Sequence, residues 1–291
     1  QAHQMFAPSW QKPGAIMQDL YATRDPLLAC LEWCLMAMLA QCSSEWRDSV
    51  QAHLASTSSM HLCGYNLKQT REPLDREKAL GQLREREPAA AQALTACTNL
   101  RSIVLNNLWQ LRDASIQVIV QSCPLLVDVR CESCVGLTDA SLQALAGLVH
   151  IRRVDLGGSP RLTDAGVLDL VTSPRGSQLE SLVLFDSYKF SDAVLRALGQ
   201  HCPRLERASF GDREGFHGSE TPYLFTDDGV RALAEGCGAL RHIELRQHLK
   251  VGDAGVAALA THCPRLERVD LKDSRITDAG LALLLEGRAL K

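Results

Sequence analysis

The strongest constraint on the fold is an apolar template that recurs from residue 100 to the end of the chain. Each copy has an apolar residue, two variable residues, a second apolar residue, one variable residue and a third apolar residue. The first members of successive copies lie 26, 25, 28, 26, 35 and 26 residues apart. A period of this length is the signature of a repeat architecture. The copies are Leu100/Ile103/Leu105, Leu126/Val129/Cys131, Ile151/Val154/Leu156, Leu179/Leu182/Leu184, Leu205/Ala208/Phe210, Leu240/Ile243/Leu245 and Leu266/Val269/Leu271.

A second motif follows each template: an apolar residue, one further residue and an aspartate. Thr or Ser often precedes the aspartate, and a hydroxyl at this place can cap the free N–H groups of a helix start, where a carboxylate is also favoured by the helix dipole. The predicted helices bury residues three apart, such as Val167/Leu170 and Leu281/Leu284. Each unit is therefore a short strand, a turn and a helix. The aspartates are Asp113, Asp139, Asp164, Asp192, Asp227, Asp253 and Asp278.

No single unit can bury its own apolar face, so neighbouring units must stack. We predict an α/β solenoid with a curved parallel β-sheet on the concave side, helices on the convex side and a helical segment at the N-terminus. Residues 1–58 form a helical or extended docking segment, 59–99 a degenerate capping repeat with a strand template at Leu62/Tyr65/Leu67, and 100–291 the seven repeats.

Recurring cysteines give the repeats a family resemblance. Cys123-Pro124, Cys202-Pro203 and Cys263-Pro264 each lead into a template, and Thr-Asp-Ala-Gly occurs at 163–166 and 277–280. These motifs resemble the leucine-rich repeat family, cysteine-containing subtype, which is found in many F-box-type substrate receptors. The resemblance covers residues 100–291 and implies a solenoid that binds proteins. A convincing F-box is missing, because the opening Leu-Pro signature is absent and residues 26–46 are too short for the whole module.

The eleven cysteines do not indicate a disulfide framework or a metal site. Their number is odd, and most of them follow the repeat, which favours free thiols in a reducing compartment: the cytoplasm or an organelle matrix. Cys131 and Cys134 form a Cys-x-x-Cys, but no second Cys/His pair follows at zinc spacing, so we expect neither metal nor cofactor.

The balanced charge and the absence of known catalytic motifs exclude several classes of function. The 31 basic and 34 acidic residues nearly balance, so nucleic acid is not an expected partner. Phosphate loops, dinucleotide fingerprints and His-Glu-x-x-His are absent, so we expect a protein without catalytic activity. We expect no transmembrane segment, because the apolar stretch near residues 27–41 is too short to span a bilayer. A chain without a transmembrane segment can still associate with a membrane complex.

The outward side chains of the strands form the first candidate site. Because side chains alternate along a strand, two columns should point away from the helices. One interpretation is that opposite charges in these columns, which include Arg153/Asp155 and Arg268/Asp270, satisfy one another across neighbouring strands. The other is a recognition face of mixed sign for a folded or peptide partner. The candidate partner-binding residues are Arg153, Asp155, Arg207, His242, Glu244, Arg268 and Asp270.

Two further segments are candidates for contacts with a partner. One repeat is about nine residues longer than the others, and in this loop Phe216, His217 and Tyr223 could anchor a partner or belong to a tolerated insertion. The helix predicted after Pro26 is apolar nearly all round and needs cover on two sides. We expect its Trp33 and Met36 to face a partner.

Two functions remain after these exclusions. The first is a non-catalytic protein-interaction scaffold, an accessory or structural subunit of a larger assembly. The alternative, implied by the family resemblance, is the substrate-recognition subunit of an SCF-type ubiquitin ligase. Regulation of a small GTPase would need a dedicated Arg/Asn arrangement at a repeat edge, which the sequence does not show.

Overall fold

The computed structural model describes residues 58–61, 98–108, 111–187, 190–211 and 225–285 of the 291-residue chain. Its described strands form a single sheet in sequence order, and every neighbouring pair is parallel. The strands are β1 (Ser59–His61), β2 (Ser102–Val104), β3 (Asp128–Arg130), β4 (Arg153–Asp155), β5 (Ser181–Val183), β6 (Arg207–Gly211), β7 (His242–Arg246) and β8 (Arg268–Asp270).

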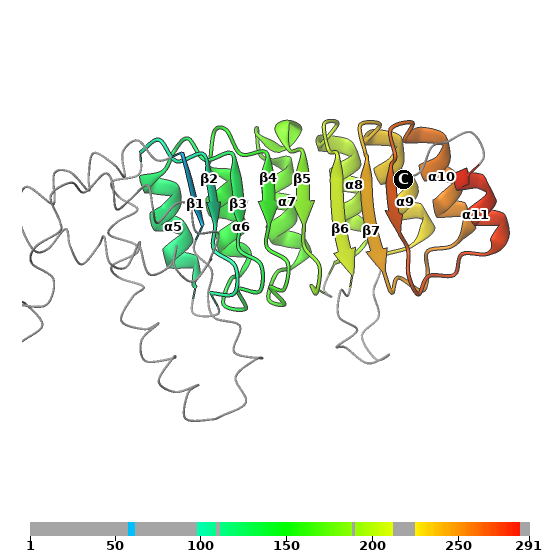
Figure 1. The fold of residues 1–291 in the computed structure, drawn as a ribbon, viewed down its shortest axis with the longest axis horizontal. Coiled ribbons are helices and arrows are strands. Elements are labelled where there is room, and N and C mark those ends of the chain that lie inside the picture. Colours follow the sequence, from blue (N-terminus) through cyan, green and yellow to red (C-terminus); the bar gives the residue numbers. More distant parts are fainter. Residues whose placement is uncertain (1–57, 62–97, 109–110, 188–189, 212–224, 286–291) are drawn as a thin grey trace, which may run out of the picture.

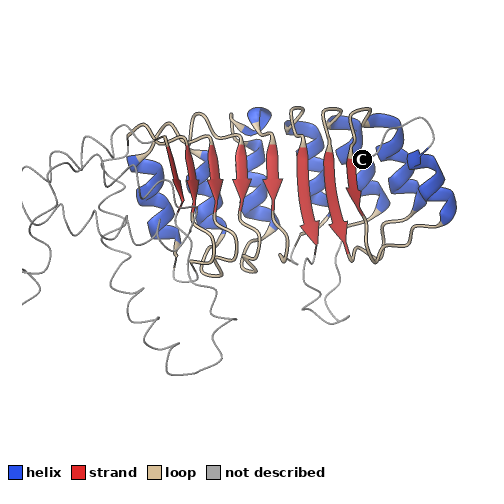
Figure 2. Ribbon diagram, in the orientation of Figure 1, coloured by secondary structure: helices blue, strands red, loops and turns tan. Residues whose placement is uncertain are grey.

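Helices alternate with the strands from β2 onward and pack on one another along the array. Figures 1 and 2 show them as a layer on one face of the sheet, while the other face is open in this view. This arrangement confirms the predicted α/β leucine-rich-repeat solenoid. The helices are α5 (Asp113–Ser122), α6 (Asp139–Ala146), α7 (Asp164–Thr172), the 3₁₀ helix η3 (Gly176–Gln178), α8 (Asp192–His201), α9 (Asp227–Gly236), α10 (Asp253–His262) and α11 (Asp278–Leu285).

The core lies between the sheet and the helices and is built by the apolar template. The middle members of the template stand in one register across the sheet, so that Ile103 pairs with Val129 and Leu182 with Ala208. These four side chains are fully buried. Larger rings fill the wider repeat: Phe210 lies edge-on to Phe190 at 6.0 Å and to Phe225 at 5.3 Å between ring centroids.

The aspartate at each helix start also ties one repeat to the next. Asp139 accepts hydrogen bonds from the backbone N–H of Thr163 at 2.8 Å and from its hydroxyl at 2.6 Å. Asp192 holds Thr226 in the same way, at 2.8 and 2.6 Å. Charged acceptors make the stronger hydrogen bonds, so these contacts, which we call the aspartate clamps, stabilise the stacking as well as the helix. The clamps are Asp113–Thr138, Asp139–Thr163, Asp164–Ser191, Asp192–Thr226, Asp227–Gly252 and Asp253–Thr277.

The clamps explain the glycine of the Thr-Asp-Ala-Gly runs. A Cβ at Gly166 would lie 2.5 Å from an oxygen of Asp139, and one at Gly280 would lie 2.2 Å from an oxygen of Asp253. The first clamp solves the same problem differently, because Ser141 donates its hydroxyl to Asp113 at 2.5 Å. Burial opposes the ionisation of Asp113, but the hydrogen bonds from Ser141 and Thr138, both in the next repeat, outweigh burial and lower the pKa of Asp113.

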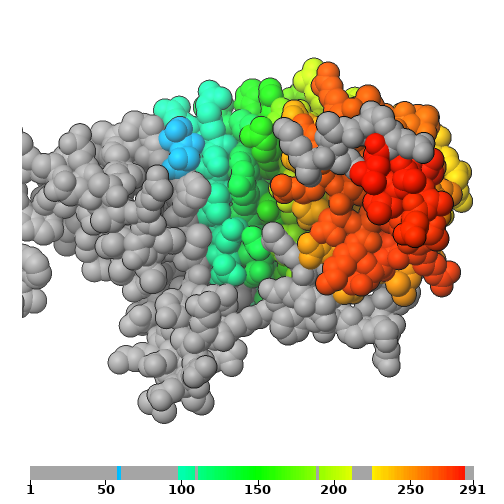
Figure 3. Space-filling view, turned by 45° about the vertical axis from the view of Figure 1, so that its right-hand side comes forward, coloured from blue at the N-terminus to red at the C-terminus, as the bar shows by residue number. Residues whose placement is uncertain are grey.

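Two expectations about the helices need correction. Thr163 and Thr226 make no side-chain cap on their own helices; their hydroxyls donate to the preceding aspartate instead. Leu284 is buried as predicted, but Leu281 is 50% exposed. In the described part of the chain no later helix covers that side of α11, which Figure 3 shows at the end of the array.

The first strand comes from the segment predicted as a degenerate capping repeat. Ser59–His61 pairs with β2, and Met60 stands opposite Ile103. The paired strand therefore precedes the expected template at Leu62/Tyr65/Leu67. That template and the rest of the capping repeat lie outside the described residues, as does the docking segment 1–57.

Candidate docking site on the strand face

The outward columns of the sheet form the surface that we call the strand face, opposite the helices. The parallel register places their members side by side across β2 to β8. This is the arrangement that the alternation of side chains predicts. The columns are Ser102, Asp128, Arg153, Ser181, Arg207, His242, Arg268 and Val104, Arg130, Asp155, Val183, Ser209, Glu244, Asp270.

Ion pairs on the strand face join mainly neighbouring strands. Arg153 contacts Glu180 at 2.9 Å, not Asp155 two residues away on β4. Arg207 contacts Glu244 at 3.1 Å, and Ser209 donates to the same carboxylate at 2.7 Å. Opposite charges therefore meet across neighbouring strands, and Arg153 and Asp155 do not pair with each other. Neighbouring strands are about 4.8 Å apart, whereas residues i and i+2 of one strand lie roughly 6.6 Å apart. The exception is Arg130, which pairs with Asp128 of its own strand β3 at 2.8 Å.

The C-terminal end of the strand face shows the same preference. Asp270 pairs with Arg246 of β7, whose Nε lies 2.6 Å from its carboxylate, and not with Arg268. Arg241 contacts Glu267 at 2.5 Å. Arg268 is exposed, and no hydrogen bond or ion pair of its side chain is found within the described ranges. Within the described residues this end therefore presents an exposed cation.

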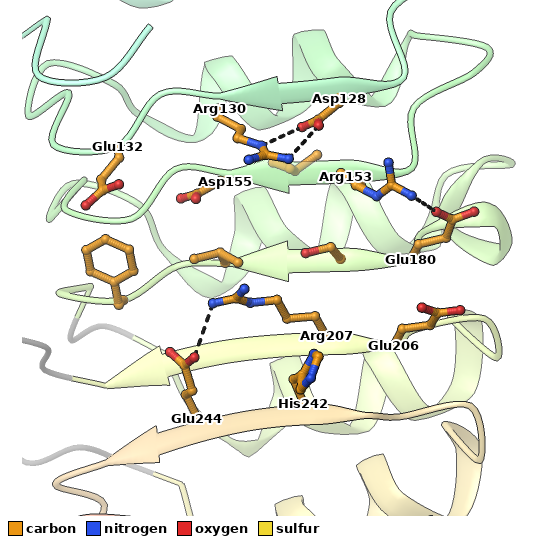
Figure 4. Close-up of a pocket in the computed structure, with 14 residues that line it drawn as sticks. Asp128, Arg130, Glu132, Arg153, Asp155, Glu180, Glu206, Arg207, His242 and Glu244 are labelled. Carbon is orange, nitrogen blue, oxygen red and sulfur yellow. Dashed lines mark hydrogen bonds and ion pairs between the residues drawn. The ribbon is translucent and has the colours of Figure 1, made fainter. Parts of the chain in front are cut away.

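A hollow of about 390 Å³ lies in the strand face between β3 and β7. Figure 4 shows its ionisable side chains, with Glu132, Asp155 and Glu244 near the carboxyl ends of the strands and Arg153, Glu180 and Glu206 near the amino ends. Val154, Ser181, Val183 and Phe185 complete the lining. Its ten ionisable residues are Asp128, Arg130, Glu132, Arg153, Asp155, Glu180, Glu206, Arg207, His242 and Glu244.

Asp155 is the most perturbed carboxyl group of the hollow. Burial raises its pKa to about 6, and the negative charge of Glu132 acts in the same direction. The backbone N–H of Gly157, which donates to Asp155 at 3.1 Å, and the charges of Arg207 and Arg130 offset this only in part. The fold therefore holds a carboxylate where its charge is poorly compensated.

One side of the hollow is apolar. The ring of Phe185 lies against Gly157, where a Cβ would come within 2.2 Å of a ring carbon. Phe185 and Val183 are 6% and 5% exposed. The absence of a side chain at Gly157 thus lets an aromatic wall stand next to Asp155.

His242 of β7 and Arg207 of β6 line another side of the hollow. Burial lowers the pKa of His242, and the charges of Arg268 and Arg207 lower it further, while Glu267 at 3.9 Å opposes them. His242 is consequently neutral at pH 7. The Nε of Arg207 is buried and makes no hydrogen bond within the described part of the chain.

The cysteines behave as core residues. The Cys134 thiol donates to the carbonyl of Leu105 at 3.1 Å, and burial raises its pKa to about 12. Burial likewise raises the pKa of Cys202 to about 12 and that of Cys123 to about 11. Among the described residues, no three His, Cys, Asp or Glu side chains are grouped so as to hold a metal ion. Nor does any described helix have the length and apolar character needed to cross a bilayer.

Comparisons with known proteins give a curated relative and distant structural neighbours. No protein-family model matches the chain. Over 194 residues the chain is 27% identical to the DNA repair protein rhp7 of Schizosaccharomyces pombe, across 65% of this chain and 33% of that protein. The chain thus spans about a third of the length of this relative.

Two solved structures illustrate the structural similarity. The structure of the Rad7 and Elc1 complex in yeast is 16% identical, with 82% of this chain and 70% of that chain covered and a TM-score of 0.45. An internalin of Listeria monocytogenes, inlF, is also 16% identical, with 68% and 48% covered and a TM-score of 0.44. Our assignment of the fold rests on the register of the sheet itself.

The predicted site residues divide into two groups. Arg153, Asp155, Arg207, His242 and Glu244 all line the hollow, while Arg268 and Asp270 stand next to it on β8. The loop residues Phe216, His217 and Tyr223 and the helix residues Trp33 and Met36 lie outside the described residues.

Sequence reasoning missed several members of the hollow. Glu180 and Glu206 precede the first outward column, and Glu132 and Phe185 follow the second. These four residues lie outside the two columns, whose members belong to the strands themselves. The charged residues immediately before the strands were the available signal, because Arg152, Glu180, Glu206, Arg241 and Glu267 occupy this one repeat position.

Proposed function

We propose that the protein is a non-catalytic interaction subunit and that its strand face docks a segment of a partner protein within a larger assembly. The hollow carries this proposal. A depression lined by ten ionisable groups and one apolar wall, on the face that the helices leave open, offers both charge and shape to a partner. The poorly compensated charge of Asp155 supports a binding role, because perturbed groups in a depression are candidates for functional sites.

The curated relative supports the same class of function. The similarity to a DNA repair protein points to work inside the cell, in keeping with six described cysteines that are free and buried. We therefore propose a reducing intracellular compartment and a role as an accessory or structural subunit.

The substrate-recognition subunit of an SCF-type ubiquitin ligase is our second proposal. It is favoured by the cysteine position that the resemblance singles out: Cys123, Cys202, Cys237 and Cys263 all end a helix and are fully buried. Co-purification with a cullin adaptor from native source tests it. If an adaptor is absent while other partners are recovered, the ligase role is rejected and the scaffold role stands.

Charge reversal on the strand face tests the main proposal. We expect Arg153→Glu with Arg268→Glu to weaken capture of partners from native extract at least tenfold, because rim charges steer and orient association. The matched control is Arg231→Glu with Arg265→Glu, which makes the same change of net charge at exposed residues away from the strand face. Equal capture by both double variants, measured by quantitative mass spectrometry, would refute the proposal.

The segments outside the described residues are proposed as secondary contacts. Phe216, His217 and Tyr223 would extend the strand face at its rim, and Trp33 and Met36 would supply a separate apolar handle. Phe216→Ala with Tyr223→Ala should weaken capture without changing the melting temperature, and so should Trp33→Glu with Met36→Glu. Unchanged capture would remove the segment concerned from the proposal.

A further inference from the structure

We propose that the end of the array at β8 and α11 is a second docking surface, which binds a strand–turn–helix segment of a partner protein in the manner of one further repeat. We call this surface the terminal face; it consists of the outer edge of β8 and the outer side of α11, at the red end of the array in Figure 3. The terminal face is separate from the hollow, which lies between β3 and β7. The two surfaces can therefore be tested independently.

The outer side of α11 carries leucines at positions that earlier repeats bury. Leu281 is 50% exposed, although the residue three positions after the helix-start aspartate is fully buried in each of the helices α5 to α10. Leu285 is 56% exposed, whereas Ala234 at the same place in α9 is fully buried. Leu281 and Leu285 lie one turn apart on one side of α11. In the earlier repeats the next helix packs on this side. The buried equivalents of Leu281 are Ile116, Leu142, Val167, Leu195, Val230 and Val256.

The outer edge of β8 presents backbone donors that hold the next strand elsewhere in the sheet. The N–H of Gln247 donates to the carbonyl of Lys272 in the next repeat at 2.8 Å, and that of Cys131 donates to β4 at 2.7 Å. The residues at these two places after β8 are Asp273 and Leu271, and within the described residues neither N–H makes a hydrogen bond. Extended segments add to such sheet edges through main-chain hydrogen bonds.

Asp278 defines what the docking segment must contain. The six earlier helix-start aspartates each hold the residue before the next helix, as Asp253 holds Thr277 at 2.9 and 2.6 Å. Asp278 is exposed, and its carboxylate makes no hydrogen bond or ion pair with any residue that the structure describes. A Ser or Thr before the helix of the docking segment would supply both donors. Gly or Ser must follow three residues later, because a larger side chain there would collide with the aspartate, as a Cβ at Gly280 would with Asp253.

The occupant that fits these features is a segment of a different protein. A unit that docks on the terminal face must have its own preceding edge uncovered. In the described part of this chain, the strands β2 to β8 each already pair with the strand before them, so a second copy offers no such unit there. The partner segment adds a strand parallel to β8, turns, and begins a helix whose apolar side covers Leu281 and Leu285. All three contacts repeat those that join neighbouring repeats within the chain.

A display library built on one of the chain's own repeats tests this docking. The probe is a phage-displayed peptide with the sequence of residues 149–172, which spans β4, the turn and α7, with positions 163 and 166 randomised. It is selected on the immobilised full chain. We expect enrichment of Ser or Thr at position 163 together with Gly or Ser at position 166, because Asp278 would hold the first and leave no room for larger side chains at the second.

Two variants of the terminal face should change this selection. With Asp278→Ala, the preference at both positions should disappear, and the unvaried peptide should bind about tenfold more weakly in fluorescence anisotropy, because two hydrogen bonds to a charged group are lost. Leu281→Glu with Leu285→Glu should abolish binding, because two carboxylates would be buried against the apolar side of the docked helix.

Matched controls make the same chemical changes elsewhere. Asp228→Ala removes an exposed carboxylate from the first turn of α9. Val135→Glu with Val149→Glu places two carboxylates at apolar residues that are 47% and 45% exposed and belong to other repeats. Both controls should select the same peptides as wild type. Circular dichroism and melting temperature show that each variant remains folded.

Several results would overturn docking at the terminal face. These are enrichment without the expected residues at positions 163 and 166, the same preference with Asp278→Ala, and no enrichment above bare resin. A dimer of the full chain that Leu281→Glu with Leu285→Glu dissociates, measured by analytical ultracentrifugation, would also overturn it, since the occupant would then be a second copy. None of these results bears on the proposed function, which the Arg153→Glu/Arg268→Glu variant decides.

Discussion

Removal of one aspartate clamp should uncouple two neighbouring repeats. In Asp139→Ala, Thr163 loses both hydrogen bonds to the carboxylate, at 2.8 and 2.6 Å. Hydrogen bonds to charged groups contribute about 1.5–3 kcal/mol each, and loss of a carboxylate at a helix start costs about 0.3–1 kcal/mol more. Because Thr163 is only half-buried, water can replace part of the lost hydrogen bonding in the variant, which reduces the loss of stability. We expect a loss of about 2–4 kcal/mol in the free energy of unfolding.

Urea unfolding followed by circular dichroism measures this loss. The matched control is Asp169→Ala on α7, whose exposed carboxylate accepts a hydrogen bond from Gln143 at 2.6 Å and from no other residue that the structure describes. We expect the control to change stability by less than about 0.5 kcal/mol. The m-value must be compared as well, because an array of stacked units can unfold in separate stages when one interface is weakened.

A double-mutant cycle with Thr163→Ala identifies the interaction itself. If the clamp acts between the two side chains and the adjacent N–H, the double variant should be less destabilised than the sum of the single variants by about 1–2 kcal/mol. Equal effects of Asp139→Ala and Asp169→Ala, or strict additivity in the cycle, would refute the reasoning that these aspartates join the repeats.

Three further predictions follow from particular groups. Burial lowers the pKa of His248, which is stacked on Phe225 at 4.5 Å, to about 3. The neutral imidazole therefore contributes fully to the free energy of unfolding above pH 6.5, and this contribution is lost as the pH falls. In urea titrations, wild type should lose roughly 2–3 kcal/mol more than His248→Leu between pH 7.5 and 4.5. Asp155→Asn should stabilise the fold by about 1–3 kcal/mol at pH 8, and this gain should vanish towards pH 4, since the pKa of Asp155 is raised to about 6; a gain that does not depend on pH would contradict it. Gly229→Ala should lower stability by about 1–3 kcal/mol in thermal melts, whereas Gly238→Ala, whose Cβ would have 3.6 Å of space, should not.

The sequence predicts the repeated part of the fold well for a physical reason. Strand and helix positions follow from apolar side chains that must be buried, and this constraint recurs every 25 to 28 residues in most units. The register of the middle template residues, such as Ile103 opposite Val129, follows directly. The first strand departs from the prediction. It lies at Ser59–His61, where Met60 takes the middle position of the template opposite Ile103.

The contacts between repeats were harder to predict. The aspartates were assigned to the helix dipole, because sequence spacing does not show that Asp139 reaches Thr163 in the next unit. The glycines that follow, such as Gly166, were the overlooked signal, since their Cβ would collide with the clamp. On the strand face, charges of the two columns were expected to satisfy one another across strands, but the partner of Arg153 is Glu180, which precedes the next strand and lies outside both columns.

Site-specific photo-crosslinking tests the central claim most directly. A compact diazirine amino acid is placed at Ser181 on the strand face or, as a control, at Gln143 on the exposed side of α6. In native extract we expect a discrete adduct from position 181 that is lost when Arg153→Glu and Arg268→Glu are added, and none from position 143. An adduct from position 143 alone, or one from position 181 that survives charge reversal, would contradict docking on the strand face.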